Sequence, residues 1–305
     1  MSRLGKTWCA KVGVLGVCLT LSACSVSWPS ASSAVPEASL KIASWNVEHL
    51  AERNGSGCRP RDDADYAALR AYVSDLHADV IAFQEVESAA AAERIFDPAI
   101  YVVLIEEREG AGRQGECRGN PGQTINAQRT GFAIRRGVPF ERLADFTVLQ
   151  VSDPDLRSGV DVIVRPVGGE PIRLLSVHLK SGCSSGDGNE ACSVLFEQVP
   201  ILESWIDDRA SEQIRFAVMG DFNRRLAMSG DAVWADWDDG VPANADLSLA
   251  SGSRSATCNP RYRDFIDFIV LDRRAAADMR QFEERTFQGE PLSDHCAVAA
   301  TLDVR

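Results

Sequence analysis

The sequence has little positive charge for a protein that would bind polyanions. Its 305 residues carry 32 Lys and Arg against 44 Asp and Glu, which gives a formal net charge of −12. A protein with this net negative charge does not bind nucleic acid through its overall charge. Any contact with nucleic acid therefore needs a local basic patch or a metal ion. An enzyme that uses a divalent cation remains compatible with this charge.

Zinc motifs and repeats are also missing. The chain has four His, no CxxC pair and no paired-His motif, which argues against a zinc site. There is no internal repeat and no long low-complexity tract, and 45% hydrophobic with 25% charged residues is an ordinary globular composition. The length suits one large domain or two small ones, and no boundary is evident after about residue 39.

The N-terminus lacks a run long enough to span a bilayer. The apolar stretch VGVLGVCLTL is too short and follows a basic start without acids, as in an export signal. It ends in LSAC (residues 21–24), which resembles the lipobox of bacterial lipoproteins, where the Cys is acylated. We predict a lipoprotein-type signal peptide over residues 1–23 and lipidation of Cys24. The alternative is a plain signal peptide cut near Ala23.

The segment after the signal is rich in Ser, Ala and Pro and has no periodicity. We interpret residues 24–39 as a flexible tether and residues 40–305 as the folded domain. The mature protein is expected to be an exported, membrane-anchored lipoprotein of the cell envelope or periplasm, retained there or released.

Export explains the cysteines. Beyond the signal region six remain, an even count that suggests up to three disulfides in an oxidising compartment. Cys183 and Cys192 flank the polar loop SSGDGNEA and are the first expected pair. We assign the other four as Cys58 with Cys117 and Cys258 with Cys296, a choice that spacing does not fix.

Strand-like apolar runs of seven to nine residues recur along the chain. They are rich in Val, Ile and Phe and cover residues 40–47, 79–86, 101–107, 130–136, 160–167, 172–179, 214–222, 264–271 and 296–304. Helical patterns cover 63–78 and 197–210, the second with Pro200 near its start or at a kink. Strands and helices without a regular βαβ rhythm predict a layered α/β fold.

Polar side chains gather at the ends of these runs. They are Asn46 and Glu48 in SWNVEH, Glu85 in IAFQEVE, His178 in LLSVHLK, Asp221 and Asn223 in VMGDFN, Asp267 in FIDFIVL, and Asp294 and His295 in PLSDHC. Because side chains alternate faces along a strand, Asp221 and Asn223 are expected to point the same way. Each residue alone is more often a turn former, an ion-pair member or a structural His. Recurrence in at least five segments favours one shared site.

The residue types suit metal-assisted hydrolysis of a phosphoester. Hard cations such as Mg²⁺ take oxygen ligands and keep several waters, so a few carboxylates and carboxamides suffice. Asp267 and His295 form a natural dyad, because an Asp that accepts from one ring nitrogen orients the other. His49 and His77 are interpreted as structural residues.

These motifs resemble the endonuclease/exonuclease/phosphatase superfamily, with its deoxyribonuclease I-like fold, over about residues 40–303. SWN, QE, HLK, GDFN, IDF and SDH occur in the family's order and at compatible spacings. The resemblance implies an α/β fold, a four-layer α-β-β-α sandwich of two mixed β-sheets. It also implies a site at one edge, where strand ends and loops converge.

The resemblance implies the roles of the site residues. It implies a Mg²⁺ (or Mn²⁺) site made by Asn46, Glu85 and Asp294, with Glu85 as the principal ligand. Glu48 matches an acidic position of this site that serves either a second ion or an outer-shell role. It implies that Asp221 and Asn223 orient the attacking water and hold the phosphate. His295, oriented by Asp267, would be a general base or a phosphate-stabilising group. The phosphate would also meet His178, which assists the leaving group, and Arg157.

The expected activity is that of a metal-dependent phosphodiesterase, foremost an extracytoplasmic nuclease that acts on nucleic acid as a monomer. Basic residues near the presumed rim either make local phosphate contacts or are ordinary solvated charges, and the sequence favours neither; they are Arg224, Arg225, Arg261 and Arg263. A phospholipid, sphingomyelin or other small phosphoester hydrolase is the alternative, for which DAVWADWDDGVP, with Trp234 and Trp237, is the candidate membrane hairpin. A catalytically silent binding lipoprotein is the third possibility.

Overall fold

The computed structural model describes residues 39–108, 115–151, 153–242 and 245–304. The predicted signal peptide, Cys24 and the tether up to residue 38 lie outside the described residues. Among the residues described, no helix combines the length and the apolar character needed to cross a membrane.

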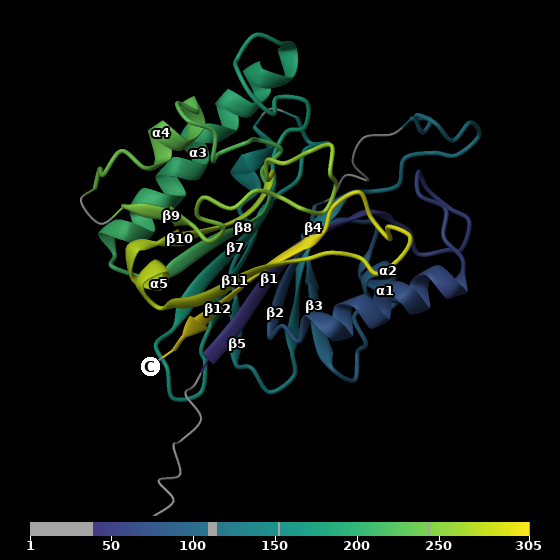
Figure 1. The fold of residues 1–305 in the computed structure, drawn as a ribbon, viewed down its shortest axis with the longest axis horizontal. Helices are drawn as coiled ribbons and strands as arrows, with labels where there is room; N and C mark the ends of the chain where they lie inside the picture. The colour runs from purple at the N-terminus through teal and green to yellow at the C-terminus, as the bar shows by residue number, and fades with distance from the viewer. Residues whose placement is uncertain (1–38, 109–114, 152, 243–244, 305) are drawn as a thin grey trace, which may run out of the picture. The chain divides into compact units, whose positions relative to one another are not determined.

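Twelve strands of the described chain form two six-stranded sheets (Figure 1). The first sheet has the order β11 (Met279–Arg285), β12 (Ala297–Asp303), β1 (Ser39–Leu50), β2 (Val80–Val86), β4 (Arg129–Arg135), β3 (Tyr101–Ile105). The second has the order β5 (Phe140–Arg142), β6 (Val160–Val164), β7 (Ile172–His178), β8 (Phe216–Asp221), β10 (Asp267–Asp272), β9 (Leu247–Leu249). Both sheets are mixed, because β1 pairs parallel with β2 and β7 with β8, while the other pairs are antiparallel.

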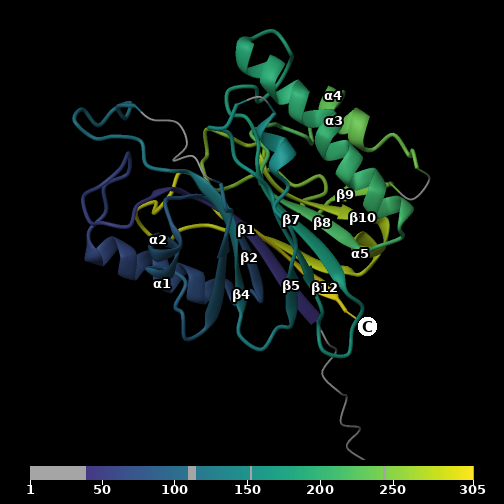
Figure 2. The same cartoon turned by 180° about the vertical axis from the view of Figure 1, so that it is seen from behind.

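Central strands are buried on both faces, which is why they are continuous apolar runs in the sequence. In β1, Ile42 packs into the core shared by the two sheets, while Trp45 points into a second core on the outer face. Helix α1 (Asp63–Leu76) covers that outer face with α2 (Ala89–Glu93), as Figure 2 also shows from behind. Each apolar side chain buried in this way contributes about 1.5–3 kcal/mol.

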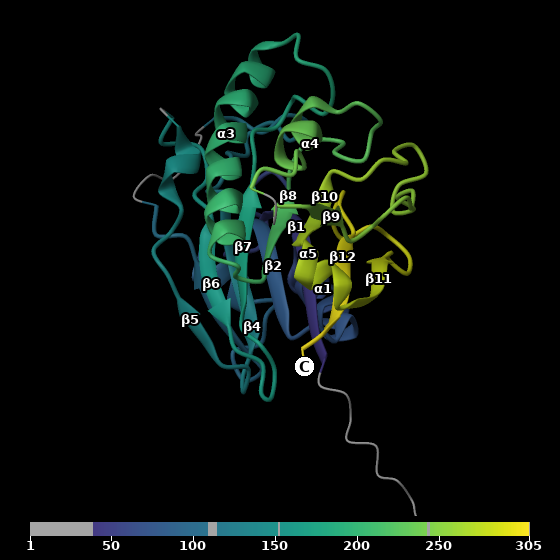
Figure 3. The same cartoon turned by 90° about the vertical axis from the view of Figure 1, so that its left-hand side faces the viewer.

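The second sheet carries its own helices. The long α3 (Glu190–Ser211) lies on it, with α4 (Ala232–Trp237) beside α3, and α5 (Arg273–Ala277) follows β10 (Figure 3). Trp205 of α3 meets Phe216 edge to face at 5.6 Å between ring centroids. Helices therefore cover the outer faces of two packed sheets, and the predicted four-layer α-β-β-α sandwich is confirmed.

The differences from expectation lie at the edges. All nine predicted strands are present. The structure adds β5, β9 and β11, which the sequence did not predict, and each of them lies at an edge of its sheet. Edge strands are short or polar because one side meets solvent, so their pattern is weak. Helix α3 begins at Glu190, capped by the Asn189 side chain, and it contains Pro200 well inside rather than near its start.

The predicted disulfide between Cys183 and Cys192 is confirmed, and the other four cysteines form the two pairs that elimination left. Cys58 bonds to Cys117, Cys183 to Cys192, and Cys258 to Cys296. Three disulfides in one domain are typical of proteins that mature in an oxidising compartment.

Candidate active site

Strand register in the second sheet brings three titratable side chains into one row. β7 ends at His178, β8 ends at Asp221 and β10 begins at Asp267. His178 pairs with Asp221 in the parallel ladder, and Asp267 faces Asp221 in the antiparallel one. Like charges directly opposite each other destabilise a sheet, so this row is not explained by stability.

The first sheet contributes residues from irregular strand ends. The β1–β2 pairing shifts between Asn46 and Leu50, and the β2–β4 pairing shifts between Phe83 and Val86. At these bulges Glu48, His49 and Glu85 have φ angles of 52°, 51° and 61°. Bulges of this kind redirect side chains beside active sites.

Backbone strain is concentrated here. Of the described non-glycine residues, seven have positive φ, and four of them are Glu48, His49, Glu85 and Asn223. Each left-handed residue of this kind costs about 1–3 kcal/mol and persists only where the surroundings enforce it. Four of the seven lie where strand ends of the two sheets meet, which makes this place the candidate functional site.

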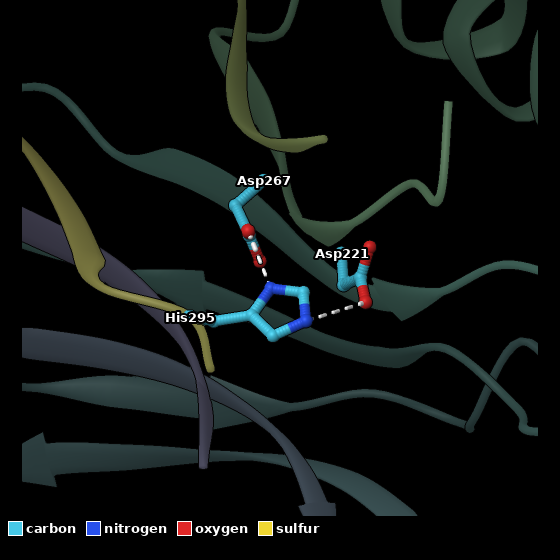
Figure 4. Close-up of side chains that lie close together, drawn as sticks. All are labelled: Asp221, Asp267 and His295. Atoms are coloured by element: carbon cyan, nitrogen blue, oxygen red, sulfur yellow. Dashed lines mark hydrogen bonds and ion pairs between the residues drawn. The ribbon is translucent and has the colours of Figure 1, made fainter. Parts of the chain in front are cut away.

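The His–Asp dyad is formed. His295 Nδ1 lies 2.7 Å from Asp267 Oδ2, and the other ring nitrogen, Nε2, faces Asp221 Oδ2 at 3.9 Å (Figure 4). The backbone also fixes His295, because its N–H donates to Ser293 Oγ and its carbonyl accepts from Trp45 Nε1. Nε2 is therefore directed at the row of the second sheet.

Asp221 is the centre of the site. It is 2% exposed, and its Oδ2 accepts from Asn46 Nδ2 at 3.1 Å, a contact between the two sheets. Its Oδ1 accepts from the backbone N–H of Asn223, whose side chain donates to the Leu179 carbonyl. The predicted strand alternation does not reach Asn223, because β8 ends at Asp221. A left-handed turn, not strand alternation, holds Asn223 beside the site.

Glu48 and Asp294 form the more exposed side of the site. The Glu48 carboxylate accepts from the backbone N–H of Asp294 at 2.9 Å and pairs with Arg59 at 2.9 Å. Asp294 Oδ1 lies 3.7 Å from His295 Nε2. Burial and the neighbouring Asp294 raise the pKa of Glu48, and burial also raises the pKa of Asp294.

Burial and like charges perturb the acids and bases unequally. Burial, followed by the Asp267 carboxylate, raises the pKa of Asp221 to about 7. Burial and then the positive Arg157 lower the pKa of His178 well below its usual value, so His178 is neutral at pH 7. Burial opposes the charge on His295, but Asp267 and Asp221 outweigh it and raise the His295 pKa well above its usual value.

The donor set fits a divalent cation. Glu85, Asp221, Asp267 and Asp294 bring four carboxylates together, and the ligand atoms of Asp221, Asp267 and His295 lie within 4.8 Å of one another. Asp267 Oδ2 is committed to His295, whereas Glu85 stays ionised, because nearby His49 and His295 lower its pKa against the effect of burial. Carboxylate and carboxamide oxygens, Glu85 and Asn46 first, are the ligands that Mg²⁺ or Mn²⁺ prefers.

Sequence reasoning missed two residues of the site. His49 donates its backbone N–H to Glu85 Oε2, and its Nε2 lies 3.7 Å from the same oxygen. The Gln128 side chain, in a segment without periodicity, is a polar neighbour of Glu85 and helps to lower the Glu85 pKa. Neither carried a signal in the sequence, because a bulge and a loop, not a repeating pattern, bring them here.

The structure separates Arg157, which the resemblance placed at the phosphate, from Arg224, which was expected at the rim. Arg157 is 8% exposed and donates Nη2 to the Leu179 carbonyl, beside Asn223. Arg224 is not at a rim: it is buried and bonded to Asp231 and to the Gly186 carbonyl, so its proposed phosphate contact is wrong. Trp237 belongs to α4, is buried and packs on Phe222, so this tryptophan of the candidate membrane hairpin is not available to a bilayer.

The order of the motifs and this geometry agree with one known sequence family. The sequence model of the Endonuclease/Exonuclease/phosphatase family matches residues 43–295. The chain belongs to this family. It is a phosphoesterase of the endonuclease/exonuclease/phosphatase superfamily, whose members generally use a divalent metal. No match was found among curated proteins.

Solved structures show the same fold at low sequence identity. The human Nocturnin catalytic domain with bound sulfate anion has a TM-score of 0.59 and 14% identity, over 88% of this chain and 96% of that one. D. rerio TDP2, humanized by 14 mutations, has a TM-score of 0.57 and 18% identity, over 88% and 100%. The AP endonuclease LMAP from Leishmania major has 0.54 and 14%, over 88% and 89%.

Proposed function

We propose that this protein is an extracytoplasmic, metal-dependent phosphodiesterase that cleaves nucleic acid. One observation carries the proposal: the Asp267–His295 dyad directs Nε2 at Asp221, which Asn46 of the other sheet contacts and near which Glu85 has a strained, left-handed backbone. A general acid, a general base and a cation site thus face one point. Such sets of perturbed titratable groups are typical of catalytic centres.

The side chains divide the chemistry. Asp221, with a pKa of about 7, is suited to orient the attacking water and take its proton. His295, held charged by Asp267, donates Nε2–H to a phosphate oxygen, and Asn223 and Arg157 hold other oxygens. His178 is neutral and buried beside Asp221, where it can donate a hydrogen bond near the leaving group. A cation held by Glu85 and Asn46, with Asp294 and Glu48 beside it, would offset charge on the phosphate.

A cavity beside the dyad supports a nucleotide substrate. It has a volume of about 290 Å³ and is lined by Asp267 and His295 on one side and by Arg225, Tyr262 and Phe265 on another. The Tyr262 side chain is 56% exposed, so its ring is available for stacking. Aromatic rings stack on bases for about 1–3 kcal/mol each. One of the similar structures is, by its description, an endonuclease.

Lipid hydrolysis is the second candidate, because the predicted lipid anchor at Cys24 would hold the enzyme at a membrane. The buried Trp237 weakens it, since α4 offers no apolar hairpin to a bilayer. A silent binding protein is disfavoured, because each matched site position carries a competent side chain. The anchor has its own test: Cys24→Ser should move the protein from the membrane to the soluble fraction, and unchanged fractionation would refute acylation.

The deciding experiment uses residues 25–305 expressed under oxidising conditions. Wild type, Asp221→Ala and His295→Ala are incubated with supercoiled plasmid and single-stranded RNA in Mg²⁺ or Mn²⁺, and with a chelator. We expect cleavage by wild type alone, abolished by the chelator. Release of phosphocholine from sphingomyelin vesicles without plasmid or RNA cleavage would move the substrate to lipid. No hydrolysis by folded protein on either panel would overturn the proposal.

A further inference from the structure

A second cavity, of about 280 Å³, adjoins the catalytic residues on a different set of loops. Its lining includes Arg108, Gln128, Arg157, Lys180 and Ser181. None of these residues lines the cavity that contains His295 and Tyr262. The two cavities are therefore separate spaces that border one centre.

Two of the lining residues connect this cavity directly to the catalytic centre. Arg157 Nη2 and Asn223 Nδ2 donate to the same Leu179 carbonyl, at 2.8 and 3.2 Å. Gln128, in the lining, is also a polar neighbour of Glu85 and helps to lower the Glu85 pKa. Lys180 lies two residues beyond the catalytic His178. A phosphate at the centre would therefore have the cavity as its neighbour.

The arginines of this cavity are buried but incompletely bonded. Arg108 and Arg157 are 7% and 8% exposed, and the Nε of each has no hydrogen-bond partner among the described residues. Arg108 Nη1 donates to the carbonyls of Asp155 and Leu156, and its Nη2 lies 3.5 Å from Glu106 Oε1. Burial lowers the pKa of both guanidinium groups. Buried donors of this kind are costly unless a ligand uses them.

Cations exceed acids in the lining. Arg108, Arg157 and Lys180 face Asp153 and Asp155, and Asp153 Oδ1 already accepts from the Asp155 backbone N–H. The Glu106 carboxylate behind the wall accepts from Ser158 N–H. A guanidinium and an ammonium group around one small space form the usual chemistry of phosphate recognition.

We propose that this cavity binds a second phosphate group of the substrate, the one next to the scissile phosphodiester in a nucleic-acid strand. The inference rests on the proposed function and adds to it: the enzyme would favour substrates that carry a flanking phosphate over a lone phosphodiester. Arg108, Lys180 and Ser181 bind this second group, and Arg157 stands between the two phosphates.

The first test compares dinucleotides that differ in one phosphate. Dithymidine monophosphate is compared with the same dinucleotide carrying an added 5′- or 3′-phosphate, all with Mg²⁺. Because hydrogen bonds to charged groups contribute about 1.5–3 kcal/mol each, we expect a KM at least about tenfold lower for one of the phosphorylated forms. Lys180→Gln should reduce this preference about tenfold, and Lys180→Gln with Ser181→Ala further. Equal KM values for all three substrates would overturn the subsite.

The matched control is Arg165→Gln. Arg165 is about half exposed and pairs with Glu141 Oε2 at 3.0 Å, away from both cavities, so the preference should not change. Arg108→Lys keeps the positive charge but removes the paired N–H donors of the guanidinium group. The variant enzyme should therefore show a smaller preference for the phosphorylated dinucleotide. If Arg108 variants fail to fold, Lys180→Gln still decides.

A binding measurement separates the subsite from catalysis. Inorganic phosphate is titrated into the metal-free protein by calorimetry, for wild type, Lys180→Gln and Arg165→Gln. We expect binding that weakens about tenfold or more only in Lys180→Gln. Binding without hydrolysis of any nucleotide would refute the proposed function but keep the anion site. Hydrolysis with no phosphate binding and no dinucleotide preference would refute the anion site but keep the proposed function.

Discussion

Asp221 and Arg224 stand three residues apart in GDFNRR, and both are 2% exposed, yet their environments are opposite. Arg224 is neutralised: its Nε lies 2.7 Å from Asp231 Oδ2, and its Nη1 donates to Gly186 O at 2.6 Å. Asp221 faces a second carboxylate, Asp267, across the strand pair.

The difference distinguishes a structural from a functional buried charge. A buried ion that is paired and bonded on all sides holds loops together, here the Cys183–Cys192 loop and the N-terminus of α4. A buried ion beside a like charge, with left-handed residues around it, costs stability that only function explains. Burial alone does not distinguish a structural buried charge from a functional one. The charges of the groups that contact it do.

The largest expected effect comes from breaking the dyad on the functional side. Asp267→Asn should lower kcat by about 10²–10⁴-fold, because the amide no longer holds His295 charged and oriented. The measurement is the initial rate of plasmid nicking with Mg²⁺, with circular dichroism to show that the fold is retained. A loss of less than about fivefold in folded protein would remove the dyad from the mechanism.

The structural charge should show the reverse behaviour. Arg224→Met should destabilise the protein by about 3–5 kcal/mol, because Asp231 stays buried without its partner. Activity per folded molecule should not change. The free energy of unfolding in urea is the measurement.

The control for this prediction is the double variant Arg224→Met, Asp231→Asn. It removes both charges but keeps the oxygen that accepts from the Val233 and Trp234 N–H groups. Most of the lost stability should return. If the double variant is as unstable as Arg224→Met, an uncompensated Asp231 is not the cause.

The smallest expected change in the free energy of unfolding is a gain in stability. Asp221→Asn should abolish activity yet stabilise the metal-free protein at pH 8 by about 1–3 kcal/mol, since one pKa unit corresponds to about 1.4 kcal/mol. The folded pKa of Asp221 is raised to about 7 from an ordinary value near 3.8, so the wild type loses stability as pH rises between these values. The gain should therefore shrink below pH 7 and vanish near pH 4.

Urea unfolding of wild type and Asp221→Asn with chelator, at pH 4 to 8, measures this gain. The matched comparison is Asp267→Asn, which removes the like-charged partner of Asp221; its free energy of unfolding is measured at the same pH values. A variant that is less stable than wild type at pH 8 would show that the contacts of Asp221 with Asn46 and Asn223 outweigh the repulsion.

The sequence by itself determined the central strands and most of the site. Strands buried on both faces must be continuous apolar runs, so all nine runs were visible, and the polar residues at their tips were visible with them. The motif order also indicated the superfamily before any coordinates. The signal peptide, the lipid at Cys24 and the roles of the site residues remain predictions.

Only the tertiary structure decided the rest. Edge strands β5, β9 and β11 have a weak pattern because solvent meets one side of each. His49, Gln128 and Asn223 reach the site through bulges, a loop and a left-handed turn, which have no sequence period. The sequence predicts Arg224 at the rim, but in the fold it is buried against Asp231. Periodicity reports which face of a strand is buried, whereas the partner of a buried charge comes from a distant segment and exists only in the folded chain.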